Sequence, residues 1–232
     1  MILERAKVIE VFDSIQGEGK YAGVPQVFVR FAGCNLACAW CDSSHARDPK
    51  PGTFRELEAE ALWKEVRPLV PQVHSVSLTG GEPLLHSAFL MEFLPFLTAA
   101  NVPVYLETNG TLPGELKKII EDVDVVAMDV KLPSSTGCQA FWDEHVEFLR
   151  IAWGKDVFIK MVISTATCTA DIERAVEMIS KGDPTMPLFL QPNHFEINSG
   201  VMDKCREYMT YCRQYLRDVR ILPQMHKFVG LR

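Results

Sequence analysis

The sequence has no long apolar run and no excess of positive charge, and these two absences exclude several classes of protein. Its most apolar stretch, 88–100, is interrupted by Glu92 and Pro95 and is shorter than the ~20 residues that a membrane span requires. The N-terminal segment mixes acidic, basic and apolar side chains, unlike a secretory signal. The 24 Lys and Arg are outnumbered by 30 Asp and Glu, which argues against a general nucleic-acid surface. We therefore expect a cytoplasmic protein that binds neither a membrane nor nucleic acid.

Low-complexity tracts, internal repeats and an even cysteine count are missing too. The seven cysteines are an odd number, so in a cytoplasmic chain they indicate metal binding or buried thiols more than a disulfide framework. No linker divides the 232 residues, of which 47% are apolar, and a chain of this size can bury a substantial core. We expect one domain over residues 1–232.

Short β-rich runs alternate with amphipathic segments along the chain. Six buried strands are predicted, at 27–31, 75–78, 102–106, 123–130, 157–163 and 188–190. This alternation favours parallel strands joined by right-handed crossovers. Six units are too few for the eight-fold barrel, which takes ~250 residues. We therefore predict an α/β fold, an open and partial six-stranded TIM-like barrel, with an N-terminal β-hairpin region at about 7–26 and a short C-terminal strand near 219–228.

Helices are expected between the strands. The T-x-x-E pattern at 53–56 is typical of a capping box and predicts that a helix opens there. Apolar residues at 172, 175, 176 and 179 predict a second helix that ends near Gly182. Cys205 and Cys212 share a seven-residue repeat with Tyr208, so we expect them to pack inside a helix. Cys138 and Cys168 are isolated and are given no role.

Polar motifs follow the predicted strands at the point where each strand ends. They are a cysteine cluster at 34–41, TGGEP at 79–83, ETNGT at 107–111, DVK at 129–131 and QPN at 191–193. The carboxyl ends of parallel strands meet at one rim, where ligands bind in such folds. The five motifs are therefore expected to converge on one site.

Cys34, Cys38 and Cys41 place three thiols within eight residues. Thiolates select zinc, copper(I) or iron-sulfur clusters. Three cysteines would hold three irons of a [4Fe-4S] cluster and leave the fourth iron open to a small molecule. Two alternatives remain at this point: a structural Cys3His zinc site completed by His45, and buried thiols on one face of a helix.

The C-x3-C-x2-C loop, with the aromatic Trp40 just before its third cysteine, resembles the hallmark of the radical S-adenosylmethionine (SAM) superfamily. Within that superfamily, the chain resembles the 7-carboxy-7-deazaguanine synthases. The matching motifs lie at 14–19, 30–36, 40–42, 79–83, 107–111 and 226–227. Because they extend over most of the chain, the resemblance does not depend on one motif.

The resemblance implies a fold, a reaction and its cofactors. The fold is the modified, shortened barrel of radical SAM enzymes. The reaction contracts 6-carboxy-5,6,7,8-tetrahydropterin to 7-carboxy-7-deazaguanine with loss of ammonia, on the route to queuosine and other 7-deazapurines, which makes the enzyme a carbon-nitrogen lyase. The cofactors are a [4Fe-4S] cluster, SAM and Mg2+. A homodimer and an electron donor such as flavodoxin are also implied.

Site residues follow from the same resemblance. The cluster ligands, counted as catalytic, would be Cys34, Cys38 and Cys41. The residues implied to bind SAM are Trp40, Cys41, Asp42, Gly81, Glu82, Asp129, Val130, Lys131, Gln191 and Asn193. The residues implied to bind the substrate are Ile15, Gln16, Gly17, Arg30, Thr79, Glu107 and Arg232. Ser43 stands where the family pattern has a threonine that binds magnesium, and its hydroxyl keeps oxygen ligation of Mg2+ possible.

Two of these residues also carry a physical argument from the sequence. Arg30 lies in the apolar run VFVRF, where a buried charge is costly unless it is paired, and it could bind a carboxylate through two hydrogen bonds. Glu82 would supply an acceptor for an ammonium, beside glycines that let the backbone approach a ligand closely.

Two other functions remain open from the sequence alone. One is a radical SAM activase that acts on a partner protein and ignores the pterin. The other is a Cys3His zinc binding module without enzyme activity.

Overall fold

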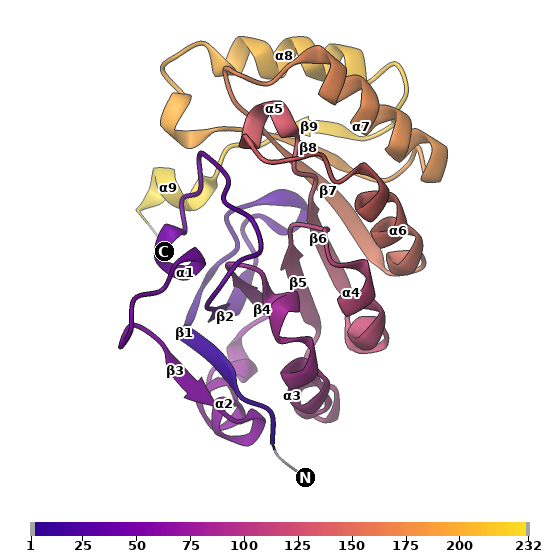
Figure 1. Ribbon diagram of the computed structural model, residues 1–232. Coiled ribbons are helices and arrows are strands. Elements are labelled where there is room, and N and C mark those ends of the chain that lie inside the picture. The colour runs from indigo at the N-terminus through magenta and orange to yellow at the C-terminus, as the bar shows by residue number, and fades with distance from the viewer. Residues whose placement is uncertain (1–2, 231–232) are drawn as a thin grey trace.

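The computed structural model describes residues 3–230, and their strands form one curved sheet (Figure 1). The strand order is β3-β1-β2-β4-β5-β6-β7-β8-β9. The strand bounds are β1 Ala6–Ile15, β2 Pro25–Phe31, β3 Arg55–Leu57, β4 Ser75–Gly80, β5 Val104–Thr108, β6 Val125–Asp129, β7 Asp156–Ile163, β8 Leu188–Pro192 and β9 Val219–Ile221.

The six predicted strands correspond to β2 and to β4 through β8, which lie next to one another in the sheet and pair in parallel. β9 continues the parallel set, whereas β1 pairs antiparallel with both β2 and β3 at the other edge. The sheet does not close into a barrel. The predicted fold class, a partial barrel with parallel strands, is confirmed.

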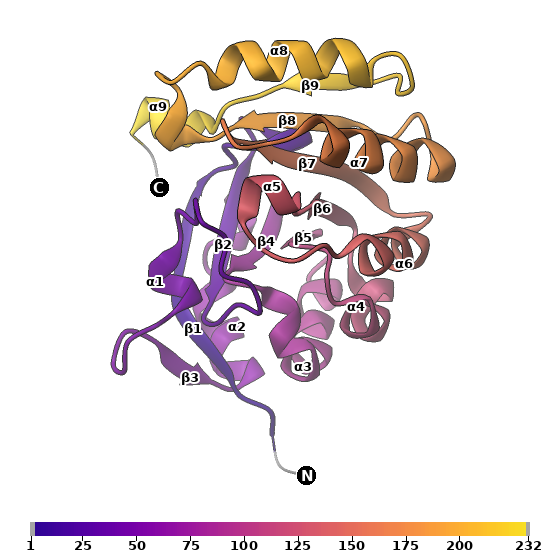
Figure 2. The ribbon, with the colours of Figure 1, turned by 45° about the horizontal axis from the view of Figure 1, so that its top comes forward.

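Helices cover the outer side of the curved sheet, most clearly α3, α4, α6, α7 and α8 in Figures 1 and 2. The helix bounds are α1 Ser44–Arg47, α2 Ala59–Val66, α3 Ser87–Ala99, α4 Pro113–Ile119, α5 Pro133–Thr136, α6 Trp142–Ala152, α7 Thr169–Gly182, α8 Val201–Cys212 and α9 Met225–Val229. Short 3-10 turns lie at Gly19–Tyr21, Val70–Gln72, Pro83–His86, Ile120–Asp122 and His194–Glu196.

Burial explains why these helices pack where they do. The predicted stripe of α7, from Ile172 to Ile179, is buried against the sheet. In α8 the thiols of Cys205 and Cys212 are buried beside Tyr208, as the repeat predicted. Removal of apolar surface from water on this side of the sheet fixes the strands and leaves their carboxyl ends free to carry polar loops.

Two local predictions were wrong. Residues 53–56 do not open a helix: Arg55–Leu57 forms β3, whose backbone groups pair with β1, and α2 begins at Ala59. The C-terminal strand is shorter than expected, because β9 ends at Ile221 and residues 225–229 form α9. Pro223 lies between them and has no N–H for a strand ladder. No helix within residues 3–230 has the length and apolar character to cross a membrane.

Candidate active site

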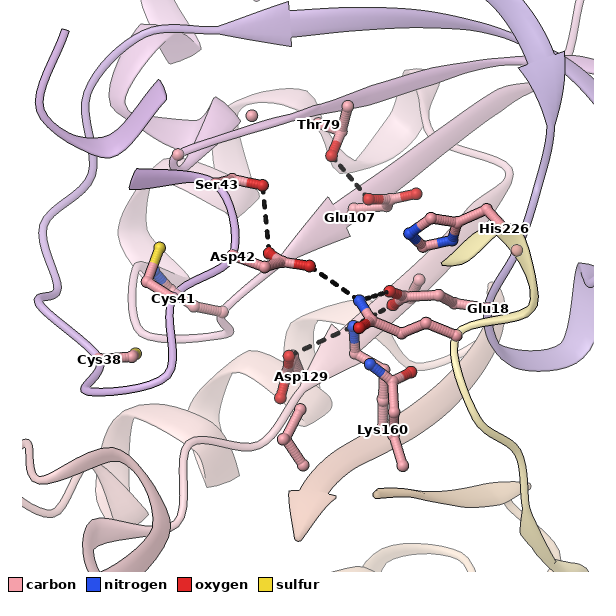
Figure 3. A pocket seen from close by; sticks show the side chains of 18 of the residues that line it. Glu18, Cys38, Cys41, Asp42, Ser43, Thr79, Glu107, Asp129, Lys160 and His226 are labelled. Atoms are coloured by element: carbon pink, nitrogen blue, oxygen red, sulfur yellow. Dashed lines mark hydrogen bonds and ion pairs between the residues drawn. The ribbon is translucent and has the colours of Figure 1, made fainter. Parts of the chain in front are cut away.

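A cavity of about 490 Å³ lies at the carboxyl ends of the strands, within the usual size range of ligand pockets. Its lining includes residues from all five polar motifs, as the topology predicted. Figure 3 shows Cys38 and Cys41 on one side of it, with Glu18, Lys160 and His226 on the other.

Cys34, Cys38 and Cys41 all line this cavity. Their loop is attached to α5, because Ala39 N donates to Thr136 O at 2.8 Å and Trp40 Nε1 donates to Ser135 Oγ at 3.0 Å. Burial raises the pKa of Cys34, and it raises the pKa of Cys38 to about 12. The thiols of Cys34 and Cys38 therefore stay protonated until a metal stabilises the thiolate.

A single metal ion does not match the arrangement of these thiols. Within residues 3–230, no three His, Cys, Asp or Glu side chains are close enough to hold one ion, although His45 also lines the cavity. Three thiols around one cavity match a larger group with several metal atoms, so the donor set fits an iron-sulfur cluster.

Gly80 and Gly81 bring the end of β4 against the start of the cysteine loop. A Cβ on Gly81 would lie 1.9 Å from Gly33 O, and one on Gly80 would lie 2.2 Å from Phe31 O. Gly80 also has a φ of +131°, a conformation that favours glycine. The close approach that these glycines allow is therefore to the chain itself, at the base of the cysteine loop.

Glu82 is fully buried and does not line the cavity. Its Oε1 accepts hydrogen bonds from Thr108 Oγ1 and Leu84 N, and its Oε2 accepts one from Asn109 N. Burial raises the pKa of Glu82 to about 7 despite these bonds. In this structure the carboxylate holds the turn after β4 to the turn after β5, and its contact with SAM stays a prediction.

Asn109 and Thr111, buried in the turn after β5, form a polar layer with the exposed Asn35 of the cysteine loop. Asn109 Oδ1 accepts from Thr111 N at 3.0 Å and from Thr111 Oγ1 at 2.6 Å. Asn109 Nδ2 donates to Asn35 Oδ1 at 2.9 Å and lies 3.9 Å from Cys34 Sγ. Asn35 Nδ2 donates to Thr111 Oγ1 at 2.8 Å. This layer fixes the cysteine loop from the sheet side.

Charged residues form the opposite wall. Lys160 Nζ pairs with Glu18 Oε2 and lies 3.4 Å from Asp129 Oδ2, which also pairs with Lys131 Nζ at 2.8 Å. Burial opposes the charge on Lys160, but Glu18 and Asp129 outweigh it and raise its pKa. The pKa of Lys131 is also raised, because Asp129 outweighs its burial. Both lysines are therefore fixed cations.

Asp129 has one oxygen left for a ligand. Among the residues that the structure describes, Asp129 Oδ1 is buried and has no hydrogen-bond partner. Asp129 is 8% exposed and lines the cavity. A buried carboxylate oxygen without a donor is costly, so its position suits a ligand that brings a hydroxyl or an ammonium.

A second polar group joins β4 and β5 to the loop after β1. Glu107 Oε2 accepts from Thr79 Oγ1 at 2.6 Å, and Glu107 Oε1 accepts from Gln16 Nε2 at 2.8 Å. Arg30 lines the cavity beside them and donates from Nε to Glu10 Oε1 at 2.8 Å. The apolar run around Arg30 thus contains a paired charge, and this wall offers both a carboxylate and a guanidinium.

α9 connects the chain's C-terminal segment to both sides of the cavity. Gln224 Nε2 donates to Glu18 Oε1 at 2.6 Å and to Asp42 Oδ2 at 2.9 Å. Met225 N donates to Gly17 O at 2.9 Å. Burial alone would raise the pKa of Asp42, but the bond from Gln224 and the charge of Lys227 lower it.

Most of the predicted site residues share this cavity. Those that line it are Ile15, Gln16, Gly17, Arg30, Cys34, Cys38, Trp40, Cys41, Asp42, Ser43, Thr79, Gly81, Glu107, Asp129, Lys131, Gln191 and Asn193. Val130 does not, because its side chain is buried in the hydrophobic core. Arg232 lies outside the described residues.

The residues that line the cavity without a role predicted from the sequence include Glu18, Asn109, Lys160 and Gln224. Lys160 carried a usable signal, since it interrupts the apolar run VFIKMVI as Arg30 interrupts VFVRF. Glu18 and Asn109 lie inside the motifs at 14–19 and 107–111, whereas nothing in the sequence around Gln224 indicates a role in the site.

The chain is similar to known proteins in both sequence and fold. Residues 28–140 match the family model of the radical SAM superfamily. The fold is similar to the crystal structure of QueE from Escherichia coli, with a TM-score of 0.69 and 24% identity over 96% of this chain and 95% of that one. It is also similar to Streptococcus suis SuiB bound to S-adenosylmethionine, with a TM-score of 0.54 and 16% identity over 84% of this chain and 48% of that one. The matched stretch, which carries the three cysteines, is thus a radical SAM domain.

Relatives that match nearly the whole chain identify its family within this class. A 7-carboxy-7-deazaguanine synthase of Geobacter sulfurreducens is 40% identical over 97% of this chain and 97% of its own length. One from Methanothermobacter thermautotrophicus is 35% identical over 100% of both chains. The chain therefore belongs to the 7-carboxy-7-deazaguanine synthase family. The relatives favour the synthase over the activase and the zinc module that the sequence left open.

Proposed function

We propose that this enzyme converts 6-carboxy-5,6,7,8-tetrahydropterin to 7-carboxy-7-deazaguanine with loss of ammonia, in the biosynthesis of queuosine or another 7-deazapurine. One observation carries the proposal. A single cavity has three thiols on one side and, on the other, a guanidinium and a hydrogen-bonded carboxylate, carried by Arg30 and Glu107. Those are the groups needed to hold a cluster next to a substrate with a carboxylate and a guanine-like edge.

The cluster and SAM fit the thiol side of the cavity. Cys34, Cys38 and Cys41 would hold the cluster, and the unpartnered Asp129 Oδ1 offers an acceptor to SAM. When bound, the two cofactors supply a 5'-deoxyadenosyl radical. The further residues proposed to contact SAM are Trp40, Asp42, Gly81, Glu82, Lys131, Gln191 and Asn193. Trp40 is held for this by Ser135, and Lys131 Nζ lies 4.8 Å from the centre of the Trp40 ring.

The substrate side would read the pterin by its hydrogen-bonding edge. Glu107 accepts bonds from Thr79 and Gln16, which fix the orientation of its carboxylate toward the N–H groups of the ring. Arg30 would bind the substrate carboxylate. Ile15, Gly17 and Arg232 are proposed as the remaining substrate contacts.

The wall opposite the thiols would position both ligands without exchanging protons. The pKa of Lys160 is raised, so its ammonium stays charged and anchors Glu18 and Asp129. Ser43 Oγ donates to Asp42 Oδ1 at 3.2 Å and faces the same cavity. We propose Ser43 as the protein ligand of Mg2+, with water and substrate oxygens completing its shell.

The assembly and the cellular setting are also proposed. One domain over 1–232 and a cytoplasmic location are proposed from the sequence, and a homodimer and an electron donor such as flavodoxin from the family resemblance. One nine-stranded sheet within the described chain supports the single domain. The formal net charge of -6 supports a protein without a nucleic-acid partner.

The direct test is an anaerobic assay of the reconstituted protein with dithionite, SAM, Mg2+ and 6-carboxytetrahydropterin, followed by mass spectrometry. We expect 7-carboxy-7-deazaguanine, with SAM regenerated rather than consumed. A control without the pterin should give no deazaguanine. Formation of 5'-deoxyadenosine without this product would retain the radical SAM class and reject the substrate.

A further inference from the structure

We propose that the side-chain amide of Asn109 donates a hydrogen bond to the Cys34 thiolate and so raises the reduction potential of the cluster. The inference rests on the proposed assignment of Cys34 as a cluster ligand. Asn109 Nδ2 lies 3.9 Å from Cys34 Sγ, and the backbone N–H of Leu36 reaches the same sulfur at 3.5 Å. Donors to a cluster sulfur stabilise the more negative, reduced state, which is why they raise the potential.

The orientation of the Asn109 amide is determined by its other bonds. Both Thr111 donors, the backbone N–H and the hydroxyl, point at Asn109 Oδ1, so the nitrogen end of the amide faces Cys34 and Asn35. One N–H is taken by Asn35 Oδ1 at 2.9 Å, and the other is the donor available to Cys34. Flipping the amide would set its oxygen against Asn35 Oδ1 and lose three bonds.

The backbone of Asn109 is also fixed, so its amide cannot easily follow the sulfur if the loop moves. Its N–H donates to Glu82 Oε2 at 2.8 Å, and its carbonyl accepts from His145 Nε2 at 3.1 Å. The residue is only 5% exposed. A preorganised donor in a site sheltered from water acts more strongly on a nearby charge than a solvated one. Asn109 is therefore a positioning residue that acts through Cys34.

The test compares two variants of the reconstituted, SAM-free protein by anaerobic EPR-monitored redox titration. Asn109→Leu removes the donor without adding charge, and we expect its midpoint potential to shift to a more negative value. Thr111→Val is the matched control, because it breaks the hydroxyl bonds to Asn35 and Asn109 but leaves the Asn109 amide beside Cys34. Its potential should equal that of the wild type.

The outcomes distinguish an effect on the reduction potential from an effect on the structure of the cysteine loop. An unchanged potential in Asn109→Leu, or equal negative shifts in both variants, overturns the inference. Should Asn109→Leu take up less iron than the wild type, Asn109→Ser replaces it and must show the same negative shift. A wild-type protein that binds no [4Fe-4S] cluster would overturn the proposed function itself, whereas a normal cluster with unchanged potentials overturns this inference alone.

Discussion

The two sides of the cavity hold their polar groups in opposite ways. On the thiol side, neutral amides and hydroxyls of Asn35, Asn109 and Thr111 surround Cys34. On the opposite side, Lys160 joins full charges of opposite sign in one buried network with Glu18 and Asp129. The first arrangement stabilises negative charge that arrives with a metal group, and the second supplies its own compensation. The thiol side thus depends on a metal group to stabilise its thiolates, whereas the ions of the charged side already balance one another and leave Asp129 Oδ1 for a ligand.

The largest expected effect comes from removing a thiol. Cys38→Ala should abolish both cluster uptake and turnover, since the charged side cannot replace a sulfur ligand. Iron analysis and the visible spectrum after anaerobic reconstitution measure the first, and product formation measures the second. The matched control is Cys168→Ala, which removes an exposed thiol away from the cavity and should keep full iron content. Equal iron in both variants would contradict the ligand assignment.

Next in size is the loss of the central cation on the charged side. Lys160→Met leaves Glu18 and Asp129 without their shared partner, and breaking such a partly buried pair should cost up to about 3 kcal/mol. Urea unfolding should show this loss in the cluster-free protein, with kcat/KM lower by ~100-fold. Lys64→Met removes an exposed pair with Glu60 and should leave the unfolding midpoint unchanged within error. An unchanged unfolding midpoint for Lys160→Met would show that these ion pairs do not stabilise the cluster-free protein.

Stability should depend on pH through Glu82, the buried carboxylate in the turn after β4. The pKa of Glu82 is about 7 in the folded protein, above its usual 4.5, so the folded state holds this proton more tightly. The resulting stability is fully present below pH 4.5 and is lost as the pH rises through 7. Glu82→Gln should remove up to about 3 kcal/mol of this decline. Urea unfolding at several pH values measures it, and parallel curves for variant and wild type would contradict it.

A smaller effect is expected at the joint between α9 and the substrate loop. A Cβ on Gly17 would lie 2.2 Å from His226 Nδ1, so Gly17→Ala must displace α9. We expect KM for the pterin to rise by ~10-fold with iron content unchanged. Gly114→Ala, where a Cβ meets nothing within 4 Å, is the control. A normal KM for Gly17→Ala would show that α9 does not shape the substrate side.

The smallest effect concerns magnesium. Ser43→Thr restores the methyl group of the family pattern and should lower the half-saturating Mg2+ concentration by about threefold, or ~0.7 kcal/mol. Ser43→Ala should raise it, because the hydroxyl is lost. Turnover measured against Mg2+ concentration checks both. Identical curves for all three proteins would remove Ser43 from the metal site.

The sequence predicted the fold better than it predicted the charged side of the cavity. Apolar runs such as VFVRF and VFIKMVI identified the buried strands, because a parallel strand covered on both faces reads as continuous apolar sequence. Residues 53–56 misled because a capping-box pattern is local, while the pairing of β3 with β1 is not. Tertiary pairing decided that segment against its local signal.

The difference between local and long-range signals also explains which site residues could be predicted. Cys34, Cys38 and Cys41 lie together in the sequence, so their spacing alone indicated shared chemistry. Gln224 and Glu18 are 206 positions apart, and only the fold places them together. Arg30 was found because it lies in a motif that resembles the family, whereas Lys160 lies in none of those motifs. A lone cation in an apolar strand reveals that it has a partner but not which one.

The contact between Gln224 and Glu18 also imposes an order on biosynthesis. It cannot form until position 224 has left the ribosome, long after the thiols at 34–41 have emerged. Closing a loop of this length is slow and entropically costly compared with the local turns of the sheet. The newborn chain therefore exposes its sulfur ligands before Gln224 can join Glu18 and Asp42 beside the cavity.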